Sequence, residues 1–355
     1  MSQETSKWLN TMTLIGQTDR RDTAWHYRAE DQGDEPNHYP GAIPSEDVKR
    51  RLFFWEPIKL PVYVKVPALS IEQADGMDDS GAPYRWIARP DRVNIARSDT
   101  FADLGMFRPS YEPHNFGAAL VDNVSHIVDD DLTGELGISS AGLLKNGAVA
   151  WVEISIPETM STNSGFQYRP NLVAATSCDG SLATTYKRTI TATVCDNTLA
   201  AALGERGGQT YKIRHTRNSG FKIANAREAL GIIFQTSEEF AAEVDRLCGI
   251  KVTGEQWDLV LKEIIPAGDT KRGATRADNR RNEVSNLWEH DNRVAPWRGT
   301  AFGVLQAFNT YRHHVSQVNS GTVRSERNMQ FAIDGTNDKE DAAVLAALGK
   351  VGVLA

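Results

Sequence analysis

The sequence lacks the features that mark several large classes of protein. Only 3 of its 355 residues are cysteine, so neither a disulfide framework nor a four-cysteine zinc site is expected. No apolar run approaches the roughly 18 residues that a membrane span needs. No basic and apolar leader stands at the N-terminus, so we expect no secretory signal. These absences predict a cytoplasmic protein that is reduced and makes no membrane contact.

Motifs for catalysis are also missing. The chain has no G-x-x-x-x-G-K-[ST] loop, G-x-G-x-x-G, HExxH or CxxC. His313 and His314 are adjacent on a predicted helix and point about 100° apart, so they are expected on the surface and not on a shared metal. Asp91 and Glu153 loosely match the acids of metal-dependent nucleases, but Ser155 stands where a lysine belongs. We expect no enzyme activity, no metal and no cofactor, and a nuclease is the weakest alternative.

What is present fits a soluble globular protein. Hydrophobic residues make up 40% of the chain and charged residues 24%. The length suits about two domains. Acids outnumber bases by 46 to 39, giving a net charge of −7, which argues against a uniformly basic surface. Net charge does not describe its distribution, so a local basic groove remains open.

The order of predicted elements favours an α+β fold with an antiparallel β-sheet and packed helices. Asn146-Gly147 and Asp179-Gly180 are hairpin signals between neighbouring strands. The predicted strands are 60–69, 84–88, 103–111, 135–144, 148–156, 171–177, 181–194 and 210–216. The strand 60–69 has prolines near both of its ends, so we expect it at the edge of a sheet. The predicted helices are 45–55, 115–128, 198–203, 221–248, 257–265 and 300–318, with a short one in 342–348.

These elements divide the chain into five segments. An N-terminal arm with a short helix and an edge strand is expected over 1–82, and an α+β core domain over 83–265. A basic loop is expected over 266–298, a C-terminal helix over 299–333 and a tail over 334–355.

Positive charge is concentrated in two stretches. Residues 185–230 contain eight basic and three acidic residues. Residues 271–298 contain seven basic and four acidic residues. Strand alternation places Lys187 among threonines on a polar face, and hydroxyls and ammonium groups both bind phosphate oxygens. Arg188 falls on the apolar side and is expected to be buried against an acid. The candidate nucleic-acid-binding residues are Lys187, Lys212, Arg214, Arg217, Lys222, Arg272, Arg276, Arg280 and Arg281.

Several short runs carry a family resemblance. They are Ser177–Ser181, Val194–Leu199, Lys212–Thr216, Ala226–Gly231 and Gly299–Asn309. In this order the chain resembles the phage/plasmid-like protein family of unknown function, which implies an origin in a bacteriophage or prophage and a bacterial host cell. The element order is also distantly similar to Rad52-like single-strand annealing proteins.

The distant resemblance implies a single-stranded-DNA-binding protein that forms homo-oligomeric rings and anneals strands in homologous recombination without nucleotide hydrolysis. It also implies a phage exonuclease or a host single-strand-binding protein as partner. The alternative is a non-enzymatic phage structural or interaction protein that self-assembles. Its acidic N-terminal residues would then contact the basic segments of another copy: Asp31, Asp34, Glu35, Glu46 and Asp47.

Overall fold

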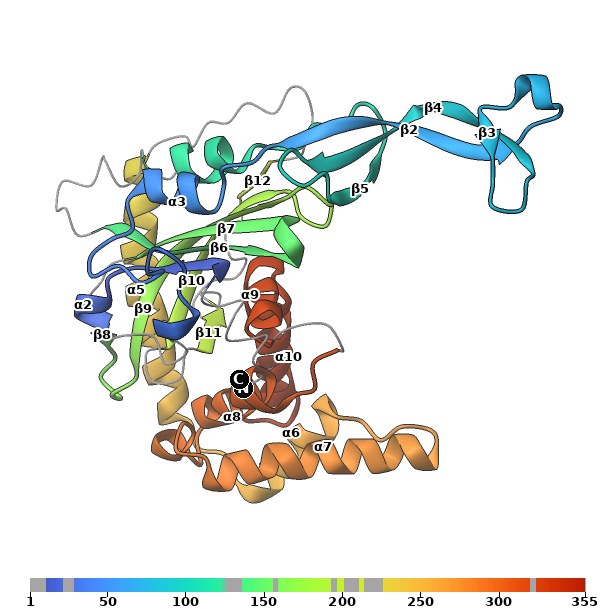
Figure 1. Ribbon diagram of the computed structural model, residues 1–355. Helices are drawn as coiled ribbons and strands as arrows, with labels where there is room; N and C mark the ends of the chain where they lie inside the picture. Colours follow the sequence, from blue (N-terminus) through green and yellow to red (C-terminus); the bar gives the residue numbers. More distant parts are fainter. Residues whose placement is uncertain are drawn as a thin grey trace.

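The computed structural model describes residues 11–21, 29–123, 125, 136–155, 159–192, 197–200, 211–213, 226–319 and 324–354. Figure 1 shows a large sheet, helices on both of its faces and a long ribbon that leaves the body on one side. The predicted α+β class with antiparallel strands is therefore confirmed.

The large sheet has the strand order β1-β6-β7-β9-β10-β11, with β8 on β9 and β12 on β10. Every pairing in it is antiparallel. Its strands are β1 (Thr13–Ile15), β6 (Gly137–Leu144), β7 (Val149–Ser155), β8 (Met160–Ser161), β9 (Gln167–Ser177), β10 (Thr184–Ala192), β11 (Asn197–Ala200) and β12 (Tyr211–Ile213).

Both predicted hairpins are confirmed at their turns. Between β6 and β7, Asn146 and Gly147 adopt φ angles of 55° and 97°, which glycine and asparagine tolerate best. Between β9 and β10, Gly180 has φ 73°, and the Asp179 carboxylate accepts the Ser181 backbone N–H at 2.8 Å. The expected helix at 198–203 is wrong where the structure describes it, because β11 pairs with β10 instead.

The second sheet forms the ribbon. It contains β2 (Pro57–Pro67), β3 (Gly76–Met77), β4 (Pro83–Arg97) and β5 (Asp103–Phe107), in the order β2-β4-β3 with β5 also on β4. The predicted edge strand at 60–69 is confirmed as β2. The expected segment boundary at 82 falls inside this ribbon, since β2 pairs with β4 along its length.

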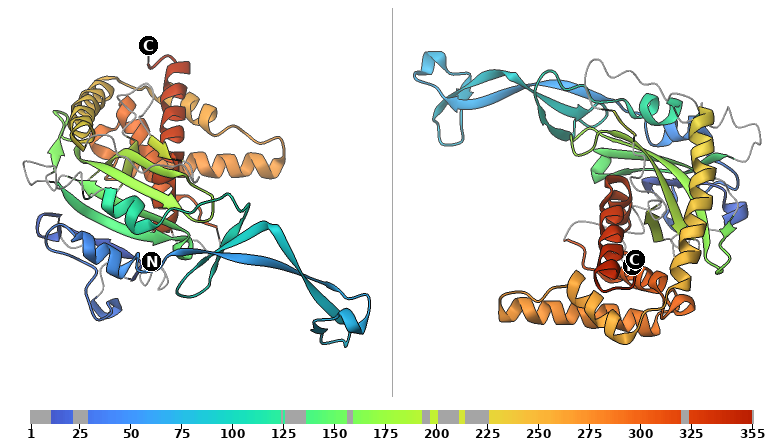
Figure 2. Two further views of the ribbon diagram at one scale, coloured as in Figure 1. Left: turned by 90° about the horizontal axis from the view of Figure 1, so that it is seen from above. Right: turned by 180° about the vertical axis from the view of Figure 1, so that it is seen from behind.

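Helices cover the large sheet and build a C-terminal layer beneath it (Figures 1 and 2). The α-helices are α2 (Thr18–Arg21), α3 (Ser45–Arg51), α5 (Ala226–Gly249), α6 (Gly254–Ile264), α7 (Lys271–His290), α8 (Ala301–Thr310), α9 (Arg324–Asp334) and α10 (Thr336–Lys350). Short 3-10 turns are η1 (Ala29–Asp31), η2 (Ile71–Gln73), η4 (Lys145–Gly147) and η6 (Ala295–Trp297), and π-helical turns are η3 (Gly117–Asp122) and η7 (Tyr311–Val315).

The predicted basic loop at 266–298 is mostly the helix α7. The Thr270 hydroxyl caps its first turn by accepting the Gly273 N–H at 3.0 Å. Its buried side chains, Ala277, Val284, Leu287 and Trp288, lie on one face. The arginines between them are good helix formers, so the polar composition that suggested a loop is compatible with an amphipathic helix.

The C-terminal region also differs from its expected form. In place of one helix at 299–333, α8 passes into the π-helical turn η7 and α9 follows separately. The expected tail forms α10, whose Val344, Ala347 and Leu348 are buried.

The polar face of β10 lies inside the protein. Thr185, Lys187 and Thr189 are all buried. The Lys187 ammonium donates to the Ala332 carbonyl at 2.9 Å and pairs with Asp338 at 2.5 Å. Strand alternation correctly predicted that these three side chains lie on the face of β10 opposite the apolar one. That face is covered by the C-terminal helices and is not open to solvent.

His313 also lies inside, so its expected position on the surface is wrong; His314 is exposed as predicted. Within the described part of the chain, neither ring nitrogen of His313 has a hydrogen-bond partner. Burial, reinforced by the nearby Arg312, lowers the pKa of His313 to about 3. Burial also lowers the pKa values of His38 and His114 to about 4.

We predict that the free energy of unfolding falls as the pH is lowered from 6.5 to 4. In that window the unfolded chain protonates these three histidines while the folded chain keeps them neutral, so acid favours unfolding. Each histidine contributes a slope of about 1.4 kcal/mol per pH unit. Urea unfolding across this range should show a shallower slope for His313→Gln. The exposed His290→Gln serves as control, and identical slopes for the parent and His313→Gln would contradict the assignment.

Among the described residues, no helix is both long and apolar enough to cross a membrane.

Candidate nucleic-acid interface

The ribbon has no hydrophobic core of its own. From Glu56 to Asn94 no residue is buried, whereas Ile95 and Ala96 at its root are fully buried. Figure 2 shows the ribbon extending well beyond the helices and the large sheet. Its side chains on both faces are therefore available to a partner.

Strand register sorts these side chains into two faces. Tyr63 pairs with Ala88, Lys65 with Trp86 and Pro67 with Tyr84, so these residues share one face. We call Tyr63, Lys65, Tyr84 and Trp86 the aromatic face. The opposite face carries Val64, Val66, Arg85 and Ile87 and is called the aliphatic face.

The aromatic face is held in order by its own contacts. The Lys65 ammonium lies 3.8 Å from the centroid of the Tyr84 ring, a cation–π contact. The Tyr84 and Trp86 rings meet edge to face, with centroids 6.0 Å apart. Tyr63 and Trp86 remain 54% and 50% exposed, which leaves flat apolar surface next to a positive charge.

Charge is distributed unevenly along the ribbon. β2 and β4 together hold six basic residues and one acid, a net charge of +5, while the connecting residues 68–82 hold four acids and no base. Four of the six cations have carboxylate partners: Arg89 and Arg92 pair with Asp91, Lys59 with Glu112, and Arg97 with Asp99.

Lys65 and Arg85 are the ribbon cations without an ion pair in the described part of the chain. One lies on each face of the ribbon. Asp91, in contrast, is committed to its neighbour, because the Arg89 guanidinium holds the pKa of that carboxyl below its usual value. The two cations can therefore accept an anionic partner without breaking an ion pair.

Three of the predicted site residues form a row on α7. Arg272, Arg276 and Arg280 follow at four-residue spacing, which places them on one helix face, and all three are exposed. The Arg280 guanidinium lies 5.3 Å from the centroid of the Tyr311 ring. Figures 1 and 2 show α7 and the ribbon projecting towards the same side of the body.

The remaining predicted residues have other positions. Arg281 donates to the Ile265 carbonyl from two nitrogens, at 2.9 and 2.6 Å, and so fixes the end of α6. Lys187 is buried, as described above. Lys212 belongs to β12, and its backbone lies opposite Thr185 of β10. The Lys212 side chain lies outside the described part. Arg214, Arg217 and Lys222 also lie outside the described residues, as does the Arg188 side chain.

The aromatic face was missed because the two strands were assigned separately. Residues 68–82 connect the two strands, and this connection is longer than the short turns that indicate a β-hairpin in a sequence. The alternation Tyr63, Lys65 in one strand and Tyr84, Trp86 in the other is the signal that could have found it. Reading both strands as one ribbon places these four residues on one face.

The structure thus defines an α+β protein with a projecting β-ribbon whose two long strands, β2 and β4, carry a net positive charge. In the ranges that the structure describes, no group of three or more His, Cys, Asp or Glu side chains is placed to hold a metal ion. A family model, the domain of unknown function DUF932, matches residues 103–341, and the chain belongs to this family. No curated protein and no solved structure matches the chain. The matched region begins after β4, so the paired strands β2 and β4 precede it.

We predict that the ribbon can be removed without unfolding the body. Replacing residues 62–91 by Asn-Gly should change the free energy of unfolding by less than about 1 kcal/mol, because none of these residues is buried. Ile95→Ala, at the buried root of the same strand, should cost about 2–4 kcal/mol. Urea unfolding measures both, and comparable losses would show that the ribbon contributes to the core.

Proposed function

We propose that this protein binds single-stranded DNA and promotes strand annealing in recombination, without nucleotide hydrolysis. The observation that carries the proposal is the aromatic face of the ribbon, where exposed Tyr63 and Trp86 flank Lys65. Proteins that bind single strands combine stacking rings with cations that follow the phosphates.

The geometry of the ribbon fits an extended strand. β2 has 11 residues, and at about 3.4 Å each it is roughly 37 Å long. Tyr63 on β2 and Trp86 on the paired strand β4 offer ring faces to bases. Each stacked base contributes about 1–3 kcal/mol. Lys65 and Arg85 supply positive charge without giving up an ion pair.

The arginine row on α7 supports the same proposal. Arg272 and Arg276 are exposed on a helix that projects towards the same side as the ribbon. Guanidinium groups bind phosphate oxygens in a bidentate manner, so this row suits a continuing nucleic-acid backbone. Lys212, Arg214, Arg217 and Lys222 remain candidates for the same interface.

Annealing follows from the way the bases would be held. A base that stacks on tyrosine or tryptophan uses its flat face, so its hydrogen-bonding edge stays open to a second strand. The chain carries no phosphate loop, so the proposal needs no nucleotide. A phage origin, a ring-shaped homo-oligomer and a partner exonuclease or host single-strand-binding protein belong to the same proposal.

We predict that Trp86→Ala and Tyr63→Ala each weaken binding of a labelled oligothymidine about tenfold, since each removes one stacked base. Val64 is next to Tyr63 on β2 but belongs to the aliphatic face, so Val64→Ala should bind as the parent does. Lys65→Gln should reduce the slope of log affinity against log salt by about 0.7. Fluorescence anisotropy measures all four.

Three results would overturn the proposal. They are no binding at low salt, equal losses for Val64→Ala and Trp86→Ala, or tighter binding to a duplex than to a single strand.

A second candidate function is self-assembly through the ribbon tip. Leu69, Ile71 and Met77 are 89%, 69% and 55% exposed there, in the acidic connection between β2 and β4. Three of the five N-terminal acids suggested for this role are engaged locally, because Glu35 and Asp47 pair with Arg50 and Glu46 pairs with Lys49. The acidic tip is therefore the better partner for the arginine row on α7 of another copy.

We predict that light scattering of the parent protein shows an oligomer, and that the double variant Glu72→Gln, Asp79→Asn lowers its mass by weakening this charge pairing. Trp86→Ala should leave the mass unchanged, which separates assembly from strand binding. The tip is excluded as the contact if the parent protein is a monomer, or if the double variant has the same oligomer mass as the parent.

A further inference from the structure

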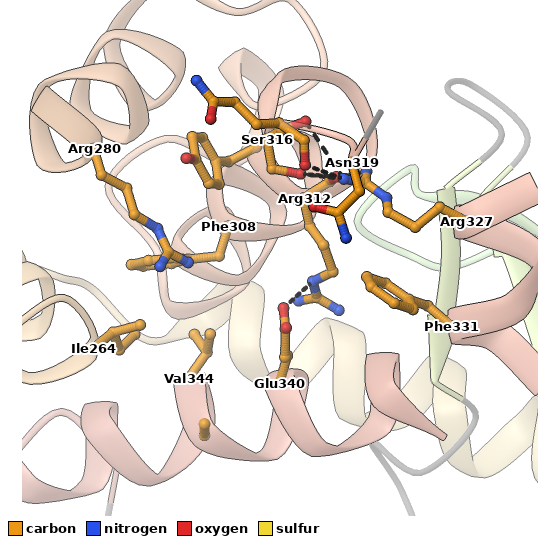
Figure 3. Close-up of a pocket in the computed structure, with 13 residues that line it drawn as sticks. Ile264, Arg280, Phe308, Arg312, Ser316, Asn319, Arg327, Phe331, Glu340 and Val344 are labelled. Carbon is orange, nitrogen blue, oxygen red and sulfur yellow. Dashed lines mark hydrogen bonds and ion pairs between the residues drawn. The ribbon is translucent and has the colours of Figure 1, made fainter. Parts of the chain in front are cut away.

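A second place for an anionic ligand lies in the C-terminal layer, away from the ribbon. A cavity of about 440 Å³ opens between α7, α9, α10 and the π-helical turn η7. This volume falls in the range of small-molecule sites. Figure 3 shows Arg280, Arg312 and Glu340 pointing into it from three different elements. π-helical turns such as η7 occur frequently at functional sites.

The cavity has an excess of positive charge. Arg280, Arg312 and Arg327 line it, together with the single acid Glu340, which leaves a net charge of +2. Arg280 and Arg327 make no ion pair in the described residues. Burial, with the nearby Arg324, lowers the pKa of Arg327, and the charge of Glu340 acts in the opposite direction.

Arg312 and Arg327 are fixed in position by the surrounding backbone. Arg312 is 5% exposed and pairs with Asp341 at 2.8 Å behind the cavity wall. Arg327 donates to the Arg312 carbonyl at 2.6 Å and to the Ser316 hydroxyl at 2.9 Å. Two guanidinium groups are therefore held in place before any ligand binds, which lowers the entropic cost of binding.

Glu340 occupies the position that a ligand anion would take. Its carboxylate lies 2.7 Å from Arg312 Nε, and its side chain is 48% exposed. It can rotate into solvent, whereas Asp341 remains on the far side of the guanidinium. A phosphate group could then replace Glu340 on Arg312 and reach the neighbouring arginines.

Aromatic rings form another part of the wall. Phe308, Tyr311 and Phe331 line the cavity, and Arg280 and Arg327 lie over the rings of Tyr311 and Phe331. Apolar rings beside guanidinium groups suit a flat heterocycle attached to an anion.

We propose that this cavity binds a nucleoside monophosphate. A phosphate monoester carries a charge of about −1.5 to −2 at neutral pH, which matches the net charge of the lining. The base would pack against the rings. The ligand is either a free nucleotide or the phosphorylated end of a strand. The site is separate from the ribbon and does not depend on strand binding there, although Arg280 also belongs to the arginine row on α7.

The test is calorimetric titration of the full chain with adenosine monophosphate. Arg280→Gln, an exposed position, should weaken binding about tenfold by removing one charge-assisted contact. Glu340→Gln should strengthen it severalfold by removing the competing carboxylate. Arg272→Gln lies two helical turns from Arg280, outside the lining, and should bind as the parent does.

Comparing 5′-phosphorylated and unphosphorylated short oligonucleotides separates the two sources, because a free-nucleotide site will not distinguish them. The proposal is overturned by no binding at millimolar nucleotide, by weaker binding in Glu340→Gln, or by inorganic phosphate binding as tightly as the nucleotide. Trp86→Ala should leave this titration unchanged, so failure of the ribbon and failure of the cavity are distinguishable.

Discussion

The C-terminal layer depends on one buried lysine. Lys187 extends from the middle of the sheet to the junction of α9 and α10, where Ala332 and Asp338 receive its ammonium. A buried charge is tolerated only when it is paired and hydrogen-bonded, so this contact requires both helices in place. The same two helices supply Arg327, Phe331 and Glu340 to the cavity. One strand residue thus helps to fix the two helices that form one side of the cavity.

Local sequence signals predicted the parts of the fold that local physics controls. Asn146-Gly147 and Asp179-Gly180 form the expected turns because their backbone conformations favour these residues. α6 ends at Ile264, before Pro266, as expected. Alternation in β10 separated the polar and apolar side chains correctly.

The parts that depend on distant segments were not predictable in this way. Nothing near Lys187 shows that the helix carrying Ala332, 145 residues later, will cover its side chain. From the local sequence alone, a buried polar face therefore resembles an exposed one. The predicted arginines Arg272, Arg276 and Arg280 are exposed as a basic surface requires, but on a helix. The aromatic face arises only when two separated strands pair. A charge count finds basic stretches, but it does not show which cations are already paired.

The three prolines of β2 have a consequence for how the ribbon meets a partner. Pro57, Pro61 and Pro67 stand on the edge strand, and proline has no backbone N–H to offer an incoming strand. A long, unpaired edge would otherwise be a template for endless strand addition. The ribbon can therefore extend far from the body without polymerising through its backbone, and recognition falls to the side chains on its two faces.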